Sequence, residues 1–253
     1  MHKGNPWISF PAPRPKAHTR LFCLPYGGGG AAAYFPWLKY LPEQIELCPI
    51  RLPGRESRLR EPALSCLEIL VDQIVLAIEP YLDKPFAIFG HSMGALIGFE
   101  LLDRLEKLAS PLRSLLFASS RRAPHLPEPD PPIHNLPDPV FIREIQNRYN
   151  GIPEAILHDR SLMELFLPTL RADIQLIETY TYTGNKLSSP IISMGGMQDR
   201  RVSPADLQAW QIVTGGDFQM QLFQGDHFYL QSKPEQMAQV ILSGLEKTMA
   251  GVE

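Results

Sequence analysis

Short apolar segments alternate with helical patterns along most of this chain. Six segments have the apolar and β-branched character of strands, at residues 20–24, 45–52, 86–89, 114–118, 190–194 and 218–223. Other segments carry apolar residues at helical spacing, at residues 31–41, 66–82, 95–102, 207–213 and 235–248. Because buried strands that alternate with helices form parallel sheets covered on both faces, the pattern predicts an α/β protein with a mostly parallel sheet.

Residues 124–182 interrupt this alternation. They contain no apolar strand pattern, begin with a proline-rich stretch and continue with helical material. Asp138 and Pro139 resemble an N-cap followed by proline at the first helical position, and residues 162–177 have the spacing of one or two amphipathic helices. We interpret the segment as a helical lid inserted into the domain. The alternative is an ordinary helical layer packed on the sheet, because periodicity reports burial and not motion.

Composition and charge narrow the class of protein. The 253 residues suffice for a single α/β domain, residues 1–253, with a full core. The 24 basic and 27 acidic residues give a net charge of −3, so nothing indicates bulk binding to nucleic acid or to a membrane. Cys23, Cys48 and Cys66 lack paired spacing, and no stretch resembles a signal peptide or a membrane span. We therefore expect free thiols in a cytoplasmic protein.

The most specific motif is Gly90-His91-Ser92-Met93-Gly94, between the strand at 86–89 and a helical pattern. A strand, a G-x-S-x-G turn and a helix resemble the nucleophile elbow of the α/β-hydrolase fold. The turn is so tight that a side chain at either glycine would clash. It holds the serine hydroxyl at a helix N-terminus, where the helix dipole favours developing negative charge. Ser92 is therefore the candidate nucleophile.

A serine hydroxyl needs an adjacent, oriented base to act at neutral pH. Among seven histidines, His227 is the candidate, because it follows a late strand where the Ser…Asp…His order of this fold places the base. His91 lies inside the elbow and cannot turn back toward its neighbour. Asp199, just past the strand at 190–194, is the candidate acid. Asp226 shares the loop of the histidine and is expected to orient backbone instead.

A tetrahedral intermediate needs two fixed N–H donors for its oxyanion. One is the backbone N–H of Met93, the residue after the nucleophile, and the second is expected from Gly27, in the glycine-rich loop of residues 25–30. The same loop also matches a loose dinucleotide fingerprint, G-x-G-x-x-A, with Arg55 available to meet a 2′-phosphate. That interpretation leaves the candidate serine, acid and base unexplained.

Six motifs, in order over nearly the whole chain, resemble those of the type II thioesterases, stand-alone editing enzymes that accompany polyketide synthases and non-ribosomal peptide synthetases. They are Leu24-Pro25-Tyr26-Gly27-Gly28-Gly29, Arg51-Leu52-Pro53-Gly54-Arg55-Glu56-Ser57-Arg58, Gly90-His91-Ser92-Met93-Gly94-Ala95, Leu167-Pro168-Thr169-Leu170-Arg171-Ala172-Asp173, Gly195-Gly196-Met197-Gln198-Asp199 and Gly225-Asp226-His227-Phe228-Tyr229. The family's triad falls on Ser92, Asp199 and His227, and its oxyanion donors fall on Met93 and Gly27. One departure is that the family more often has alanine at the position of Gly27.

The resemblance implies an α/β-hydrolase fold and hydrolysis of acyl or aminoacyl groups from the phosphopantetheine thiol of an acyl or peptidyl carrier protein. This reaction would clear stalled or misprimed chains. A thioester carbonyl has little resonance stabilisation and a thiolate leaves readily, so a triad suffices. No HExxH, CxxC or carboxylate cluster indicates a metal, and no cofactor is expected.

Two regions are candidates for contact with the substrate. The first is a basic loop, whose arginines could bind the phosphate of the arm or an acidic carrier protein, or could form ordinary pairs with Glu56 and Glu61. These arginines are Arg51, Arg55, Arg58 and Arg60. The second is the insertion, whose apolar side chains are expected to contact the acyl chain. They are Phe141, Ile145, Leu165, Phe166 and Leu170.

Two other functions stay open at this point. A small-molecule carboxylesterase or lipase would use the same triad, and it would turn over p-nitrophenyl esters better than carrier-bound thioesters. A non-catalytic binding protein on the same fold would not be labelled at Ser92 by a fluorophosphonate.

Overall fold

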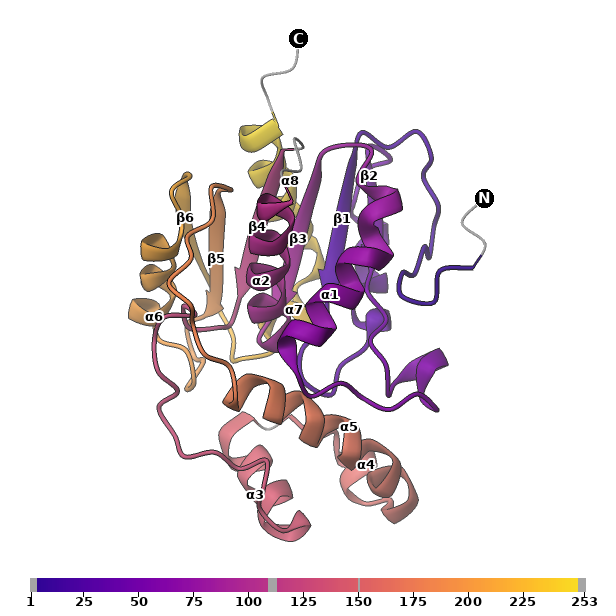
Figure 1. Cartoon of the computed structure of the whole chain (residues 1–253), viewed down its shortest axis with the longest axis vertical. Helices are drawn as coiled ribbons and strands as arrows, with labels where there is room; N and C mark the ends of the chain where they lie inside the picture. The colour runs from indigo at the N-terminus through magenta and orange to yellow at the C-terminus, as the bar shows by residue number, and fades with distance from the viewer. Residues whose placement is uncertain (1–3, 109–112, 150, 250–253) are drawn as a thin grey trace.

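A six-stranded parallel sheet forms the centre of the molecule (Figure 1). The computed structural model describes residues 4–108, 113–149 and 151–249. The strands are β1 (Thr19–Leu24), β2 (Ile45–Pro49), β3 (Phe86–His91), β4 (Ser114–Ser119), β5 (Ile191–Gly196) and β6 (Phe218–Phe223). Their spatial order is β2-β1-β3-β4-β5-β6, and every neighbouring pair is parallel. The predicted α/β architecture is confirmed.

Helices cover both faces of the sheet (Figure 1). On one face α1 (Leu67–Ile78) and α2 (Met93–Lys107) bury an apolar layer that includes Phe22 and Ile88. On the other face the 3₁₀ helix η1 (Ala31–Lys39) and α8 (Pro234–Met249) cover a second layer, which includes Leu21 and Phe89. Neighbouring strand residues thus belong to opposite layers, as the two-residue repeat of a strand requires.

The helical predictions needed three local corrections. The helix predicted over residues 31–41 is the 3₁₀ helix Ala31–Lys39, with Pro36 inside it; proline has no N–H to donate to the preceding turn. Residues 66–82 divide into α1 and the short η3 (Glu79–Tyr81), which has proline near its start. Residues 207–213 divide between α6 (Pro204–Gln208), which a Ser203 capping box starts, and η4 (Ala209–Val213). The elements η2 (Glu56–Arg58) and α7 (Tyr229–Ser232) are single turns in loops.

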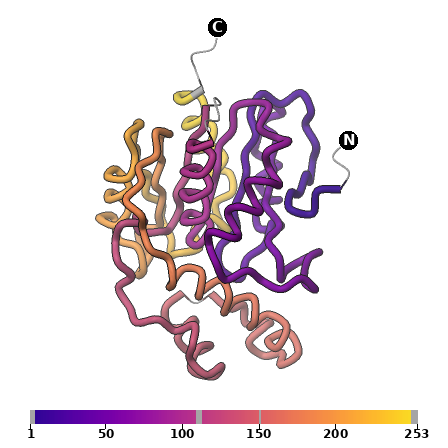
Figure 2. Tube along the Cα trace, in the orientation of Figure 1, coloured from indigo at the N-terminus to yellow at the C-terminus, as the bar shows by residue number. Residues whose placement is uncertain are grey.

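The predicted insertion is helical and lies beyond the carboxyl ends of the strands. The chain leaves the sheet after β4, forms a separate layer and returns to β5 (Figure 2). This layer contains α3 (Asp138–Tyr149), α4 (Glu154–Leu157) and α5 (Arg160–Glu178). Residues 162–177 thus belong to one helix, which continues through Pro168. The buried face of α5 includes Leu170, Ile174 and Ile177, as the spacing predicts.

Two further sequence observations can be compared with the structure. Cys23 and Cys48 are buried free thiols, and Cys66 is a partly exposed one. Within the described ranges, each helix is too short or too polar to cross a membrane.

Candidate active site

The strained turn predicted at Ser92 is present. Ser92 has φ 53° and ψ −114° and immediately precedes α2, at the carboxyl end of β3. A side chain on Gly90 would place its Cβ 2.1 Å from the carbonyl oxygen of Gly94, and one on Gly94 would reach 2.3 Å from that of Leu24. Both glycines are therefore required by close backbone contact. The turn holds the Ser92 hydroxyl at the N-terminus of a 15-residue helix.

The candidate base and acid meet from the loops after β6 and β5. His227 Nδ1 lies 2.8 Å from Asp199 Oδ2, and the Asp199 side chain is fully buried. The other carboxylate oxygen, Oδ1, accepts hydrogen bonds from the backbone N–H groups of Arg201, at 2.8 Å, and Val202, at 3.3 Å. These bonds fix the carboxylate, which in turn orients the imidazole through Nδ1 and leaves Nε2 as the ring nitrogen that can accept a proton. Ser92 and His227 line the same pockets.

Asp226, the neighbouring carboxylate, has a different contact. Its Oδ1 accepts a hydrogen bond at 2.9 Å from the backbone N–H of Phe228, so it shapes the loop that carries His227. This geometry keeps Asp199 as the candidate acid.

A buried polar chain lies beneath this pair. Ser119 Oγ is hydrogen-bonded to His91 Nδ1 and to the Tyr229 hydroxyl, each at 2.8 Å. Burial, followed by the nearby His227, lowers the pKa of His91 well below its usual value. The two histidine rings have centroids 5.3 Å apart. The His91 ring is therefore neutral, and it packs near the His227 ring without placing a second positive charge beside it.

The glycine-rich loop offers the backbone N–H of Gly27, which has no acceptor among the hydrogen bonds of the described residues. Gly27 lines a pocket together with Ser92 and His227. The next N–H, of Gly28, donates to Asp173 Oδ2 at 2.8 Å, and that of Gly29 donates to the Tyr26 carbonyl. A methyl group on Gly27 would come no closer than 3.9 Å to Asp173, so the alanine more frequent in the resembled family would fit here.

Asp173, on helix α5 of the insertion, is a residue of the site to which its sequence motif alone gave no role. Its side chain is 2% exposed and accepts two hydrogen bonds from the Arg55 guanidinium, at 2.7 and 2.9 Å, besides the one from Gly28. Arg55 also donates to the Gly29 carbonyl at 3.0 Å. Asp173 thus ties the insertion to the glycine-rich loop of residues 25–30. The sequence contained a signal for this contact, because a carboxylate on the apolar face of an amphipathic helix requires a hydrogen-bonding partner.

The basic loop is mostly engaged in structural contacts. Arg55 is buried against Asp173 and offers no open surface to a substrate, contrary to the expectation for it. Arg58 pairs with Glu61 and lies over the Trp7 ring, and Arg51 donates to the Ile8 carbonyl. The alternative of local pairing therefore describes these three arginines better than substrate binding does.

The apolar residues predicted to contact the acyl chain occupy different environments. An apolar pocket at Ser92, the candidate acyl pocket, is lined by Ile145 and Leu170, which were both predicted, and by Ile174 and Ile177, which were not. Phe141 is fully buried beneath the Arg171 guanidinium instead. Phe166 packs against Gly28, and Leu165 is 50% exposed. Periodicity identified the helix, but which of its residues face Ser92 depends on the rotation of α5 that Asp173 fixes.

The dinucleotide interpretation of the glycine-rich loop does not hold. The backbone N–H groups of Ala31 and Ala32, which would have to meet a pyrophosphate, donate to the Glu56 carboxylate at 3.1 and 2.9 Å. Arg55, its proposed 2′-phosphate contact, is bound to Asp173. Over the described ranges, no cluster of three or more His, Cys, Asp or Glu side chains is arranged to hold a metal ion.

Comparisons with known proteins agree with this geometry. The thioesterase domain model matches residues 19–245. The chain is 39% identical to "Linear gramicidin dehydrogenase LgrE" of Brevibacillus parabrevis, over 97% of this chain and 94% of that protein. It is 37% identical to "Thioesterase PikA5" of Streptomyces venezuelae, over 88% and 80% of the two. The solved structure of the type II thioesterase BorB from the borrelidin biosynthetic cluster has a TM-score of 0.84 and 31% identity, covering 97% of this chain and 98% of that one.

Proposed function

This chain belongs to the thioesterase family, and we propose that it hydrolyses acyl or aminoacyl thioesters carried on the phosphopantetheine arm of acyl or peptidyl carrier proteins. In this role it is a stand-alone editing enzyme that clears stalled or misprimed chains from polyketide or peptide synthases. The observation that carries the proposal is the buried Asp199–His227 pair beside Ser92 at the mouth of an apolar pocket. Relatives named for gramicidin and borrelidin biosynthesis support the assignment to such systems.

The geometry supports a two-step reaction. In the first step His227 Nε2 takes the proton of the Ser92 hydroxyl while Oγ attacks the thioester carbonyl carbon. The oxyanion accepts hydrogen bonds from the N–H groups of Met93 and Gly27. Each of these hydrogen bonds lowers the barrier by about 3 kcal/mol. The C–S bond then breaks and His227 returns the proton to the leaving sulfur. In the second step His227 takes a proton from water, the hydroxide attacks the acyl-serine, and a carboxylic acid leaves as the proton returns to Ser92.

The proposed partners also suggest a compartment. Carrier-linked synthesis needs free pantetheine thiols, and the three cysteines of this chain are free as well. Thiols persist in the reducing cytoplasm, so we place the protein there.

We further propose that the chain is a single domain in which residues 124–182 act as a lid. The acyl pocket encloses only about 30 Å³, space for one or two water molecules, so an acyl chain requires part of its wall to move. The C-terminal half of α5 is fixed by Asp173 and by a hydrogen bond from Thr169 to the Gly54 carbonyl. By contrast α4 has no buried residue, and it directly follows Tyr149 and Gly151, which line the pocket. The corner at residues 151–165 is therefore the moving part.

Hydrogen exchange tests this division of the lid. We expect amides of residues 151–165 to exchange much faster than those of residues 167–177. Asp173→Asn should remove the difference, destabilise the protein by about 3 kcal/mol and lower kcat roughly 10²-fold, because it breaks a buried ion pair and loosens the glycine-rich loop. Glu164→Gln, at an exposed pair with Arg160, is the matched control and should change none of these three quantities. Uniform protection across the insertion would contradict a mobile corner.

The proposed substrate class is tested by comparing leaving groups. The same series of acyl chains would be loaded on a carrier protein, on coenzyme A and on p-nitrophenol. We expect kcat/KM to be highest for the carrier protein, by about tenfold or more, which corresponds to 1.4 kcal/mol of transition-state binding. Faster turnover of the p-nitrophenyl esters would identify a small-molecule esterase instead. If none of the substrates were hydrolysed and a fluorophosphonate did not label Ser92, the protein would be a binding protein.

A further inference from the structure

Ser119, the last residue of β4, contacts both the turn that carries Ser92 and the segment that carries His227. Its backbone carbonyl accepts a hydrogen bond at 2.8 Å from the N–H of Ser92. Its hydroxyl is hydrogen-bonded to His91 Nδ1 and to the Tyr229 hydroxyl, each at 2.8 Å. His91 directly precedes Ser92, and Tyr229 follows His227 by two residues. One buried serine therefore connects the candidate nucleophile with the loop of the candidate base.

The direction of these hydrogen bonds follows from the Tyr229 hydroxyl. Tyr229 is 1% exposed, and among the hydrogen bonds of the described residues its hydroxyl has no partner other than Ser119 Oγ. Because a buried O–H requires an acceptor, Tyr229 donates to Ser119. The Ser119 hydroxyl has one proton, which it then donates to His91 Nδ1. A neutral ring that accepts at Nδ1 carries its own proton on Nε2, so His91 is the Nε2–H tautomer.

The Nε2–H of His91 faces the backbone of His227. The His227 backbone acts against burial by raising the pKa of His91, as a carbonyl that accepts from a ring N–H does. The contact falls short of hydrogen-bond geometry, because His91 Nε2 is among the buried atoms without a partner in the described part of the chain. Such an atom calls for an explanation. Hydrogen bonds in active sites are often long without substrate and tighten only when it is bound.

We propose that His91 is a positioning residue, which holds the backbone of His227 by donating from Nε2. Ser119 in turn fixes the tautomer of His91 and the backbone N–H of Ser92. Asp199 restrains the side chain of His227 at Nδ1, and His91 restrains the backbone from which that side chain extends. The inference rests on the proposed function through the catalytic roles that it gives to Ser92 and His227.

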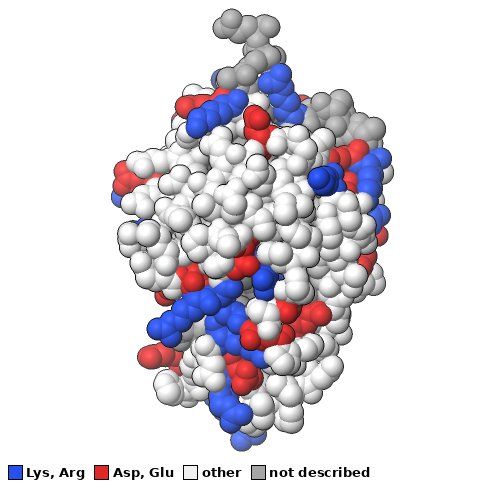
Figure 3. Space-filling view, turned by 90° about the vertical axis from the view of Figure 1, so that its left-hand side faces the viewer, with Lys and Arg blue, Asp and Glu red and all other residues white. Residues whose placement is uncertain are grey.

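A support without charge suits this edge of the sheet. Lys and Arg side chains on the β6 side lie mainly in the lower half of the molecule, among Asp and Glu (Figure 3). The carboxyl ends of the strands, where Ser92 follows β3, lie in the same half (Figure 1). His227 becomes an imidazolium during the attack, so a positive charge on His91, whose ring centroid is 5.3 Å away, would oppose that step. Two hydroxyls and a neutral imidazole supply hydrogen bonds without this cost.

Two amide substitutions at position 91 separate the roles of the ring nitrogens. Glutamine can place an N–H donor near the position of Nε2, whereas asparagine reaches only the region of Nδ1. We expect His91→Asn and His91→Leu to lower both the rate of Ser92 labelling by a fluorophosphonate and kcat for a carrier-bound thioester about 30-fold. KM should change less than about twofold, since a fully buried side chain does not contact substrate. His91→Gln should restore both rates to within about threefold of wild type.

The tautomer of His91 gives a spectroscopic test that a role in packing alone does not predict. In protein labelled with ¹⁵N at the imidazole nitrogens, we expect a neutral His91 ring protonated at Nε2. Ser119→Ala removes the donor to Nδ1 but keeps the carbonyl that Ser92 uses. It should shift part of the His91 population to the Nδ1–H tautomer, which assigns the signals, and lower the labelling rate about tenfold. This variant provides a result even where the variants at position 91 fold poorly.

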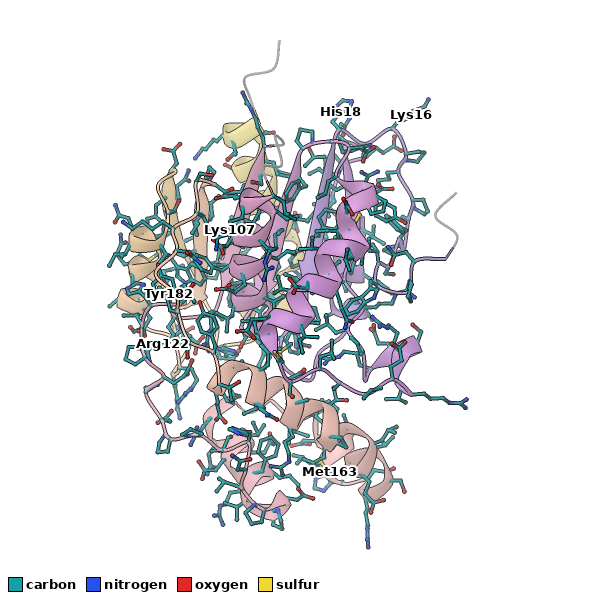
Figure 4. All side chains as sticks on the ribbon, viewed as in Figure 1. Lys16, His18, Lys107, Arg122, Met163 and Tyr182 are labelled. Atoms are coloured by element: carbon teal, nitrogen blue, oxygen red, sulfur yellow. The ribbon has the colours of Figure 1, made fainter. Side chains whose placement is uncertain are left out.

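His125→Leu is the matched control, because His125 also has a buried ring nitrogen without a hydrogen-bond partner. Its ring lies beside that of Tyr182, on the segment that leads from α5 to β5 (Figure 4). Tyr182 packs against the apolar layer under α1 and α2, whereas Tyr229 belongs to the layer on the other face of the sheet. The labelling rate of His125→Leu should stay within about twofold of wild type.

Equal losses in His91→Gln and His91→Asn would overturn the proposal, because only the packing of the ring would then matter. A wild-type His91 ring protonated at Nδ1 would overturn it as well, since Nε2 would then be an acceptor that faces a carbonyl. Labelling by a fluorophosphonate needs an activated serine but no thioester. A protein that shows the expected labelling pattern without hydrolysing carrier-bound thioesters would therefore contradict the proposed function and not this inference.

Discussion

Ser92→Ala is expected to lower kcat about 10⁵-fold while leaving the fold intact. Without the nucleophile, only the oxyanion donors and substrate binding still accelerate hydrolysis, and they give a small residual rate. Serine and alanine share the same Cβ, so the turn at φ 53° tolerates both equally. Single-turnover hydrolysis of a carrier-bound thioester measures the effect, and thermal unfolding checks the fold.

His227→Ala should cause nearly the same loss, because a serine hydroxyl without its base is a poor nucleophile. The double variant should be hardly slower than either single variant, since the residues act as one unit. If Ser92→Ala retained a tenth of the wild-type activity, or if the two losses multiplied, Ser92 could not be the nucleophile activated by His227.

The sheet and the candidate triad could be predicted from the sequence because their signals are local. Strands β1, β3 and β4 are buried on both faces, so each is a nearly continuous apolar run that is bounded by turn residues. The elbow needs glycine at fixed positions for steric reasons, and the order of the fold places the acid and base after later strands. Each of these signals lies in a short contiguous segment of the sequence. The structure brings His227 and Asp199 together as predicted.

The substrate-facing surfaces were harder to predict because they depend on tertiary contacts. Arg55 carries the same charge whether it is exposed or paired, and only the position of α5 reveals its contact with Asp173. A second pocket beside Ser92 and His227 combines residues 121 and 122 with residue 201, which become neighbours because β4 and β5 are adjacent in the sheet. Nothing in the local sequence encodes that juxtaposition.

Asp199→Asn is expected to lower kcat about 10⁴-fold with little change in KM, because the substitution forces the wrong imidazole tautomer. The backbone N–H groups of Arg201 and Val202 both donate to one carboxylate oxygen, Oδ1. In the variant these two donors retain the amide oxygen, so the amide nitrogen must face His227 Nδ1. A donor in that place favours the tautomer protonated at Nε2, which cannot accept the proton of Ser92.

Asp226→Asn is the matched control for this change. The amide oxygen of asparagine still accepts the hydrogen bond from the Phe228 backbone, so activity should stay within about threefold of wild type. Pre-steady-state kinetics on a carrier-bound thioester would separate acylation from binding for both variants. Full activity of Asp199→Asn, or a larger loss in Asp226→Asn, would move the role of the acid to Asp226. Because both carboxylates flank His227 and only Asp199 contacts its ring nitrogen, this pair of variants isolates the hydrogen bond to the imidazole from the general negative charge of the loop.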